Sequence, residues 1–334
     1  MHRFLLFEES KINPMPDPHL RPLDHSRDLM PVADLIEECF RETIDPDGLD
    51  YLAYLRDVAR QEQAIPGWAL YNAQIRPRFD GYVWEEDGRI VGNVTLLPTR
   101  KQGKRIFLIA NVAVKHEYRG RGIGRKLTER ALAGVMERKG SAAWLQVRED
   151  NPLAHGLYLS MGFTERACRT TWVIDSKIPE RKPIQNGYSQ HSRKEKDWNL
   201  QRSWLAQLYP DEVNWNLPFR EELFLPGILR GVSRALNGEW VNHWVIKENT
   251  DIRGFITWQA TRSYYDLLWP AIEWEGSDEI LNALLALPWR GMGIHKPIAI
   301  NYPAGKSDLV FLQNGFTHQA TLVWMEAGAL EPVR

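Results

Sequence analysis

The chain has 334 residues, 43% of them hydrophobic, which is enough for two domains with sizeable cores. Its formal net charge of −1 argues against a general binder of nucleic acids or acidic membranes. The cysteines, Cys39 and Cys168, lack a Cys-x-x-Cys spacing, so we expect neither a disulfide framework nor a zinc or other metal site. Without an apolar run long enough for a membrane span or a signal peptide, we expect a cytoplasmic protein.

The first half of the chain alternates predicted helices and strands. Residues 1–17 have no hydrophobic period and contain several prolines, which predicts an N-terminal tail. The pattern then predicts, in chain order, a short strand (20–23), helices over 31–41 and 48–61 capped by Asp28 and Asp47, a hairpin (strands 81–85 and 89–97), a strand (106–114), a helix (124–139), a strand (142–147), a helix (151–160) and a strand (163–174). This order indicates a mixed α/β sheet.

The second half of the chain repeats the first. Residues 176–183 are rich in proline and charge, which predicts a linker. Beyond it, Phe311-Leu-Gln-Asn-Gly-Phe matches Tyr158-Leu-Ser-Met-Gly-Phe, and a hairpin recurs in which Gly254-Phe255 stands where Gly92-Asn93 stood. A repeat unit this long indicates two related domains, over residues 18–175 and 184–334.

A basic, glycine-rich turn follows the strand over 106–114 and reads Arg119-Gly-Arg-Gly-Ile-Gly-Arg125. A helix start has unpaired N–H groups and a partial positive charge, and glycines leave room for a ligand beside the backbone. The turn is therefore suited to phosphate, although a solvated basic turn is the alternative interpretation. Its spacing fits neither a P-loop nor a Rossmann turn, because no Lys-Ser or Lys-Thr follows and the third glycine comes too early.

Two segments resemble signatures of the GNAT acyltransferases, which use acetyl-CoA. Arg119-x-x-Gly122-x-Gly124 after an apolar strand is similar to Arg/Gln-x-x-Gly-x-Gly/Ala, and the segment from Asn151 to Phe163 is similar to Asn-x-x-Ala-x-x-x-Tyr-x-x-x-Gly-Phe. The resemblance implies an α/β fold of two tandem GNAT-like domains, each a mixed, mostly antiparallel twisted sheet flanked by helices. It implies an N-acetyltransferase that moves the acetyl group of acetyl-CoA to the amine of a small molecule or peptide. No metal, nucleic acid or membrane is expected, and the protein would be a monomer or homodimer.

The same resemblance implies the site. Main-chain groups of the strand would pair with the thioester arm, the turn would hold the phosphates, and Tyr158 would protonate the departing thiolate. A phenol of pKa about 10 suits a thiolate of pKa about 8.5 or higher. The expected cofactor-binding residues are Asn111, Val112, Ala113, Val114, Arg119, Gly120, Arg121, Gly122, Ile123, Gly124, Arg125, Asn151, Ala154 and Tyr158. Asn151 also suits a helix N-cap. Substrate contacts are expected from residues 28–66 and the hairpin, and the general base stays unassigned.

The second copy lacks these features. The segment Glu273-Trp-Glu-Gly-Ser-Asp-Glu279 has no arginine and four acidic residues, which would repel a pyrophosphate, and Phe311 replaces Tyr158. We therefore expect a degenerate GNAT-like second domain without acetyl-CoA. Three alternatives stay open: an acyl-CoA-binding sensor or regulatory protein without turnover, a transferase similar to mycothiol synthase, whose second copy is the catalytic one, and an aminoacyl-tRNA-dependent transferase.

Overall fold

The computed structural model describes residues 17–64, 80–175, 187–273, 278–288 and 296–328. The predicted tail up to Pro16 and the predicted linker over 176–183 lie outside these residues. The chain groups into two compact units. The first unit comprises Met1–Gln146, Leu157–Thr164 and Glu326–Arg334, and the second comprises Val147–Gly156 and Glu165–Met325.

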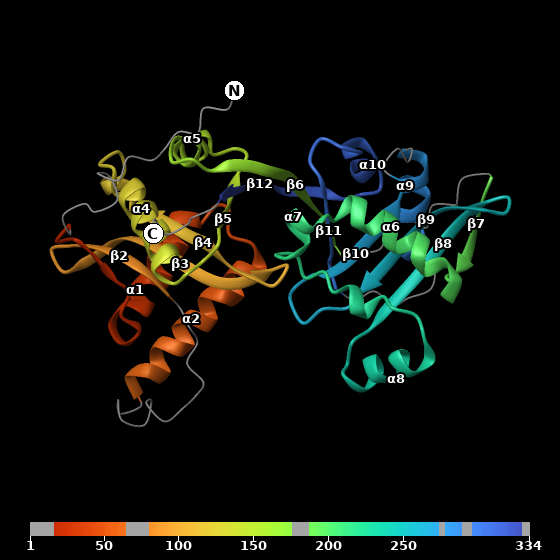
Figure 1. The fold of residues 1–334 in the computed structure, drawn as a ribbon, viewed down its shortest axis with the longest axis horizontal. Helices are drawn as coiled ribbons and strands as arrows, with labels where there is room; N and C mark the ends of the chain where they lie inside the picture. Colours follow the sequence, from red (N-terminus) through yellow and green to blue (C-terminus); the bar gives the residue numbers. More distant parts are fainter. Residues whose placement is uncertain (1–16, 65–79, 176–186, 274–277, 289–295, 329–334) are drawn as a thin grey trace. The chain divides into compact units, whose positions relative to one another are not determined.

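The first half of the chain forms the sheet order β1-β2-β3-β4-β5 (Figure 1). The elements are β1 (Leu20–Pro22), α1 (His25–Phe40), α2 (Pro46–Ala64), β2 (Asp80–Glu86), β3 (Arg89–Lys101), β4 (Lys104–Val114), the short 3-10 helix η2 (His116–Tyr118), α4 (Ile123–Glu137), β5 (Ala143–Arg148) and α5 (Pro152–Ser160). Strands β1 to β4 pair antiparallel, and β4 pairs parallel with β5. The predicted mixed, mostly antiparallel sheet is confirmed.

The sheet of the first unit has a helix layer on each face. Val83 of β2 belongs to the core formed with α1 and α2. The next residue, Trp84, pairs with Gly92 and faces α4 on the other side, because side chains alternate along a strand. A Cβ atom on Gly92 would lie 3.0 Å from Leu127 Cδ1 and 3.2 Å from Ile123 Cγ2, both on α4. The glycine therefore lets α4 pack directly against the centre of the sheet.

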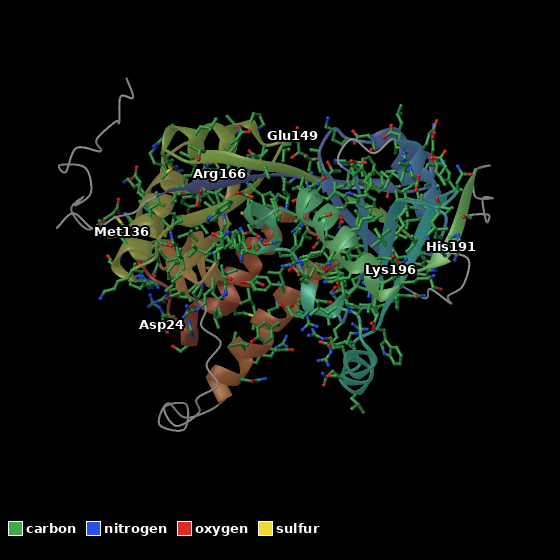
Figure 2. All side chains as sticks on the ribbon, turned by 45° about the vertical axis from the view of Figure 1, so that its right-hand side comes forward. Asp24, Met136, Glu149, Arg166, His191 and Lys196 are labelled. Carbon is green, nitrogen blue, oxygen red and sulfur yellow. The ribbon has the colours of Figure 1, made fainter. Side chains whose placement is uncertain are left out.

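Two helix caps differ from the sequence prediction. Helix α1 begins at His25 rather than at Pro31, and its cap is Asp24 (labelled in Figure 2), which accepts a hydrogen bond from the Ser26 N–H at 3.0 Å. Asp28, the predicted cap, is buried one turn further on and binds the Arg21 guanidinium at 2.5 and 2.9 Å. The prediction was wrong because proline favours the first turn of a helix, whereas Pro31 lies inside α1.

The cap before α2 also lies earlier than predicted. The Asp45 side chain accepts a hydrogen bond from the Gly48 N–H at 2.7 Å. Asp47 is already in the first turn of the helix, where its negative charge is favourable. Neighbouring aspartates at a helix start cannot be ranked from sequence alone, because the choice depends on the backbone angles of the entry.

Strand β6 and the strands that follow it form the order β12-β6-β11-β10-β9-β8-β7. The elements are β6 (Thr164–Ile174), β7 (Tyr188–Ser192), η3 (Glu195–Asp197), α6 (Trp198–Leu208), α7 (Asp211–Asn214), η4 (Glu221–Leu223), α8 (Ile228–Leu236), β8 (Val241–Glu248), β9 (Asp251–Gln259), β10 (Asp266–Ile272), α9 (Asp278–Leu285), β11 (Ile298–Pro303), α10 (Asp308–Gln313) and β12 (Thr317–Ala327). The strand predicted over 163–174 forms, and its antiparallel partner is β11, from Ile174↔Ile298 to Arg169↔Pro303.

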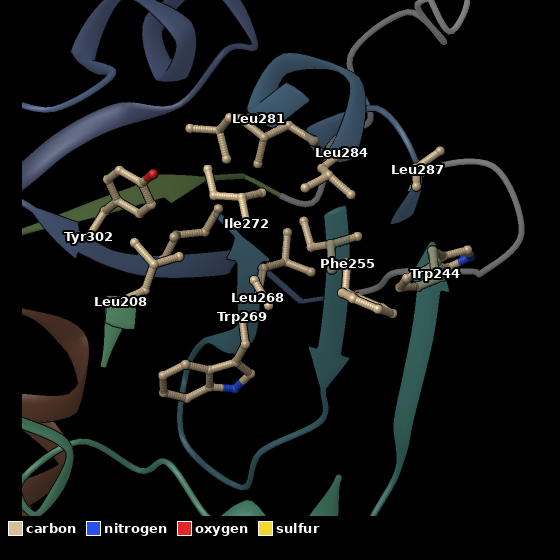
Figure 3. Close-up of a cluster of buried hydrophobic side chains, with 14 of the residues drawn as sticks. Leu208, Trp244, Phe255, Leu268, Trp269, Ile272, Leu281, Leu284, Leu287 and Tyr302 are labelled. Carbon is tan, nitrogen blue, oxygen red and sulfur yellow. The ribbon is translucent and has the colours of Figure 1, made fainter. Parts of the chain in front are cut away.

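The second unit repeats the helix-on-sheet contact of the first. A Cβ atom on Gly254 of β9 would lie 2.8 Å from Leu284 Cδ1 and 3.1 Å from Ile280 Cγ2, both on α9. This is the contact that Gly92 makes with α4. The surrounding core is rich in aromatic and aliphatic side chains, including the buried Trp269 (Figure 3). None of the described helices is long and apolar enough to cross a membrane.

The contact at Gly254 can be tested by overpacking. The Gly254→Val substitution should lower the free energy of unfolding by about 1–3 kcal/mol, because its side chain would clash with α9. The measurement is urea denaturation of the full-length protein. The control is Gly156→Ala in α5, where an added Cβ meets nothing within 4 Å, so we expect unchanged or slightly higher stability. Equal unfolding midpoints for Gly254→Val and wild type would contradict the close packing.

Candidate active site

The C-terminal half of β4 has a partner on one side only. Among the described residues, the pairing of β4 with β5 covers Phe107↔Ala143 to Ile109↔Leu145 and does not extend to Ala110–Val114. Those residues still pair with β3 on the other side, up to Val114↔Gly92. An extended chain can therefore add main-chain hydrogen bonds along this edge. The segment holds the four strand residues predicted to bind the cofactor.

A β-bulge interrupts β4 within this segment. Asn93 pairs with Ala113 and Thr95 pairs with Ala110, so two residues of β4, Asn111 and Val112, oppose the single residue Val94. Asn111 has a φ of 52°, in the left-handed region. A bulge leaves one residue outside the regular ladder and turns the strand, so it changes the direction of the main-chain groups at this edge.

The glycine turn brings the chain from β4 into α4 without a side-chain cap. Gly122 is the N-cap residue of α4, with a φ of 78°, and no side chain bonds to the helix start. The first turn contains no acidic residue. Cβ atoms on Gly120 or Gly122 would meet nothing within 4 Å, so the space beside the backbone is open. The free N–H groups and the helix dipole suit a phosphate, which supports the predicted anion cradle.

The basic side chains of the turn are exposed and hold the turn in place. Arg119 Nε donates to the Val114 carbonyl at 3.0 Å, and an Arg121 N–H donates to the Glu117 carbonyl at 3.2 Å. Arg125 donates to Ser160 Oγ at 2.6 Å, so it connects the start of α4 to the end of α5. Each guanidinium has further N–H groups for an anion.

Helix α5 carries the second predicted motif. Asn151 Oδ1 accepts from the Ala154 N–H at 3.1 Å, so Asn151 is the N-cap that the sequence predicts. Gly162 follows the helix with a φ of 86°, as expected of a helix-ending glycine. The grouping of contacts assigns Tyr158 to the first unit, with Asn111–Val114 and the turn, whereas Asn151 and Ala154 belong to the second unit.

Tyr158 is the buried residue of α5. Its side chain is 6% exposed and packs edge-on against Phe163, with ring centroids 5.8 Å apart. Burial raises the pKa of Tyr158 to about 12, because the phenolate would lose its hydration. The phenol therefore stays protonated throughout the neutral range, and it is a weaker acid than an exposed tyrosine.

Sequence reasoning missed a polar cluster beside the bulge. Asn93 and Thr95 are buried on β3, and Asn93 donates to the Asn111 carbonyl at 3.0 Å. Asn111 Nδ2 in turn donates to the Tyr51 hydroxyl on α2 at 3.2 Å. The available signal was an asparagine in the middle of an otherwise apolar strand. Among the described residues, no group of three His, Cys, Asp or Glu side chains is placed to hold a metal ion.

A surface cavity of about 470 Å³ lies between α1 and the β2–β3 hairpin. None of the predicted cofactor-binding residues lines it, although it borders the segments from which substrate contacts are expected. Its acidic groups are paired with cations: Asp28 and Glu85 with Arg21, Asp34 with Arg56, and Glu38 with Lys115. Much of the charge in this cavity is therefore neutralised within the protein.

The second unit lacks the equivalent features. Asp278 and Glu279 occupy the first turn of α9, where negative charge opposes phosphate binding. Residues 274–277, which precede α9, lie outside the described residues. Phe311 stands in the place of Tyr158 and is fully buried, stacked on Trp172 with centroids 5.1 Å apart.

Comparison with known proteins finds a family match for part of the chain. The profile of the acetyltransferase (GNAT) family matches residues 32–163, which include β4, the glycine turn, α4 and α5. Over residues 32–163 the chain therefore matches the GNAT family. A GCN5-related N-acetyltransferase from Sphaerobacter thermophilus shares the fold over 95% of this chain and 98% of its own, with a TM-score of 0.57 and 14% identity. The GNAT fold therefore extends beyond the matched segment.

Sequence relatives match only part of the GNAT domain. The ribosomal protein bS18-alanine N-acetyltransferase of Escherichia coli K12 is 37% identical over 62 residues, 19% of this chain and 42% of that relative. The chain thus matches less than half the length of this relative. A second solved structure with a similar fold contains a glucosamine N-acetyltransferase region of a fungal multi-domain β-N-acetylglucosaminidase. The structural match covers 92% of this chain and 37% of that chain, with a TM-score of 0.54 and 12% identity.

The protonation state of Tyr158 can be tested by ultraviolet titration. Wild type and Tyr158→Phe should show the same phenolate absorbance up to about pH 11, because the buried phenol does not ionise below that. In denaturant, the two titrations should differ by one tyrosine near pH 10. A difference of one phenolate between the folded proteins at pH 10 would contradict the burial of the hydroxyl.

Proposed function

We propose that the protein is an acetyl-CoA-dependent N-acetyltransferase whose active domain spans residues 18–175. The observation that carries the proposal is the uncapped start of α4, directly after a strand whose edge is unpaired. The helix start suits an anion, and the strand edge suits an amide-containing arm. The two are adjacent in the chain. Residues 184–334 would form a degenerate domain without acetyl-CoA, which the acidic start of α9 and the buried Phe311 support.

The chain offers binding groups for each part of acetyl-CoA. The main chain of Asn111–Val114 would pair with the amide arm, and the turn from Arg119 to Arg125 would hold the phosphates. Asn151 and Ala154, at the start of α5, would contact the cofactor from that helix. Acetyl-CoA supplies the activated thioester, so the protein has to position the two substrates and manage the protons.

Tyr158 would act as the general acid. The amine nitrogen attacks the thioester carbonyl carbon, the C–S bond breaks, and the leaving thiolate takes a proton from the Tyr158 phenol. The nitrogen loses one proton, which ends in solvent, and solvent returns one proton to the Tyr158 phenolate, so the protons balance. The phenol is protonated at neutral pH, which is the state that this role requires. The base that receives the amine proton is not assigned to a side chain.

The acceptor would be the amine of a small molecule or peptide. The bS18-alanine N-acetyltransferase relative supports including a peptide with an N-terminal alanine among the first acceptors tested. Both cysteines are free thiols, which fits a reducing cytoplasm. A net charge of −1 disfavours a nucleic-acid substrate.

The cradle can be tested by calorimetric titration with acetyl-CoA. Gly122→Trp should abolish binding, because the indole would cover the open space beside the start of α4 and strain a residue with a φ of 78°. Gly103→Trp is the matched control, since Gly103 has a φ of 76° in the β3–β4 turn and equally open surroundings. We expect wild-type affinity for the control. Equal affinities for both variants would refute the cradle.

The role of Tyr158 can be tested by comparing binding with turnover. Tyr158→Phe should bind acetyl-CoA with unchanged affinity and lower turnover of an accepted amine by about 10²- to 10⁴-fold, because only the proton donor is lost. The measurement combines calorimetry with release of free CoA. Turnover near the wild-type rate would remove the acid role. Tight binding by the wild type without turnover of any amine would favour the sensor alternative.

A further inference from the structure

The bulge in β4 holds an unusual backbone conformation. Asn111 is the one described non-glycine residue with positive φ that lies inside a strand. The others lie in turns or at helix ends: Asp87, Gln102, Lys139, Asn249 and Ser307. The left-handed conformation costs about 1–2 kcal/mol for most residues and less for asparagine. Neighbouring side chains must therefore favour it here.

Asn93 makes the contact that favours the bulge. Its Nδ2 donates to the Asn111 carbonyl at 3.0 Å and, more weakly, to Thr95 Oγ1 at 3.3 Å. Rotating the amide by half a turn would place its oxygen against the Asn111 carbonyl, so the hydrogen bonds determine its orientation. The amide thus takes the place of the ladder partner that the bulge removes.

Burial of the Asn93 side chain costs folding free energy. It is fully buried, and its Oδ1 has no hydrogen-bond partner among the described residues. A buried carbonyl without a donor costs about 1–3 kcal/mol. The unpaired Oδ1 therefore lowers the stability of the fold. A leucine, which is similar in size, would fill this core position without that cost. Asn93 is better explained by its bond to the bulge than by packing.

Helix α2 supports the bulge from the same face of the sheet. Asn93 pairs with Val83, which belongs to the core formed with α1 and α2. Asn111 Nδ2 donates to the Tyr51 hydroxyl of α2 at 3.2 Å. Burial raises the pKa of Tyr51, so this hydroxyl stays protonated, and its oxygen accepts the bond. The side chain of the bulged residue is therefore held as well as its carbonyl.

The second unit provides an internal comparison. Its equivalent strands pair without a shift, from Leu267↔Gln259 to Ile272↔Gly254. No residue of β10 has a positive φ, and Phe255 stands in the place of Asn93. The copy with the glycine turn thus has both the bulge and the asparagine, whereas the copy with an acidic helix start has neither. The bulge accompanies the binding turn and is not required by the shared sheet.

We propose that Asn93 is a positioning residue, which holds the bulge at Asn111 and thereby aims the main chain of Asn111–Val114 at the thioester arm of acetyl-CoA. This inference rests on the proposed function. Without the Asn93 amide, the Asn111 carbonyl loses its partner and the strand tends toward the regular register of β10. The main-chain groups at the open edge of β4 would then point in other directions, and the cofactor would bind less tightly.

The test measures acetyl-CoA affinity by calorimetry and thermal stability in the full-length protein. Asn93→Leu should weaken binding by about 5- to 100-fold, because one buried hydrogen bond to the bulge is lost. Asn93→Ser is a smaller second variant that leaves room for water and should show a loss in the same direction. Adding Asn111→Gly to Asn93→Leu should recover part of the affinity, because glycine adopts positive φ without strain.

The control is Thr257→Val, in the second unit. Thr257 is fully buried and its hydroxyl binds Gln201 at 2.9 Å and His243 at 2.8 Å, so its loss should lower thermal stability without changing acetyl-CoA affinity. Wild-type affinity in a folded Asn93→Leu or Asn93→Ser protein would overturn the inference. Lost affinity without recovery by Asn111→Gly would also overturn it. If the wild type does not bind acetyl-CoA, the proposed function itself fails, which is a distinct result.

Discussion

The site depends on how β4 is paired. This strand must stay hydrogen-bonded to β3 up to Val114, yet its other edge is unpaired after Ile109 among the described residues. If β5 followed β4 to its end, the edge would be closed, and the glycine turn would have only a surface role. Because the two parallel strands part, an unpaired strand edge and an uncapped helix start are adjacent in one short segment. A hydrogen-bonding edge and a partial positive charge are what an amide arm ending in phosphates requires.

The two units show that the scaffold and the chemistry can be separated. Both bring a helix onto the sheet through a glycine on the second strand of a hairpin, Gly92 in one and Gly254 in the other. Both also have a central parallel pair of strands, β4 with β5 and β10 with β11. They differ in the charge at the helix start and in the bulge. These differences involve few residues, so one copy can lose a ligand site while keeping its core.

Most features that depend on residues close together in the sequence were predicted correctly, and most features that depend on distant residues were not. Hydrophobic period and turn residues predicted β4, α4 and the hairpin, because these signals are local. Asn151 was predicted as a helix N-cap for the same reason, and the structure has it there. The predicted start of α1 was wrong because Pro31 lies inside the helix and not in its first turn, and Asp28, the predicted cap, is buried against Arg21, a contact between separate elements. The role of Asn93 was missed because its partner, the Asn111 carbonyl, lies on the neighbouring strand.

Residue type and spacing were enough to predict the family signatures, the internal repeat and the acidic character of the second copy. The bulge in β4, the limited pairing of β4 with β5 and the pairing of β6 with β11 became visible only in the folded chain. Strand register and strand neighbours depend on contacts between segments far apart in the chain. Such contacts leave no periodic pattern within either segment, so they cannot be predicted from the residue pattern of one segment.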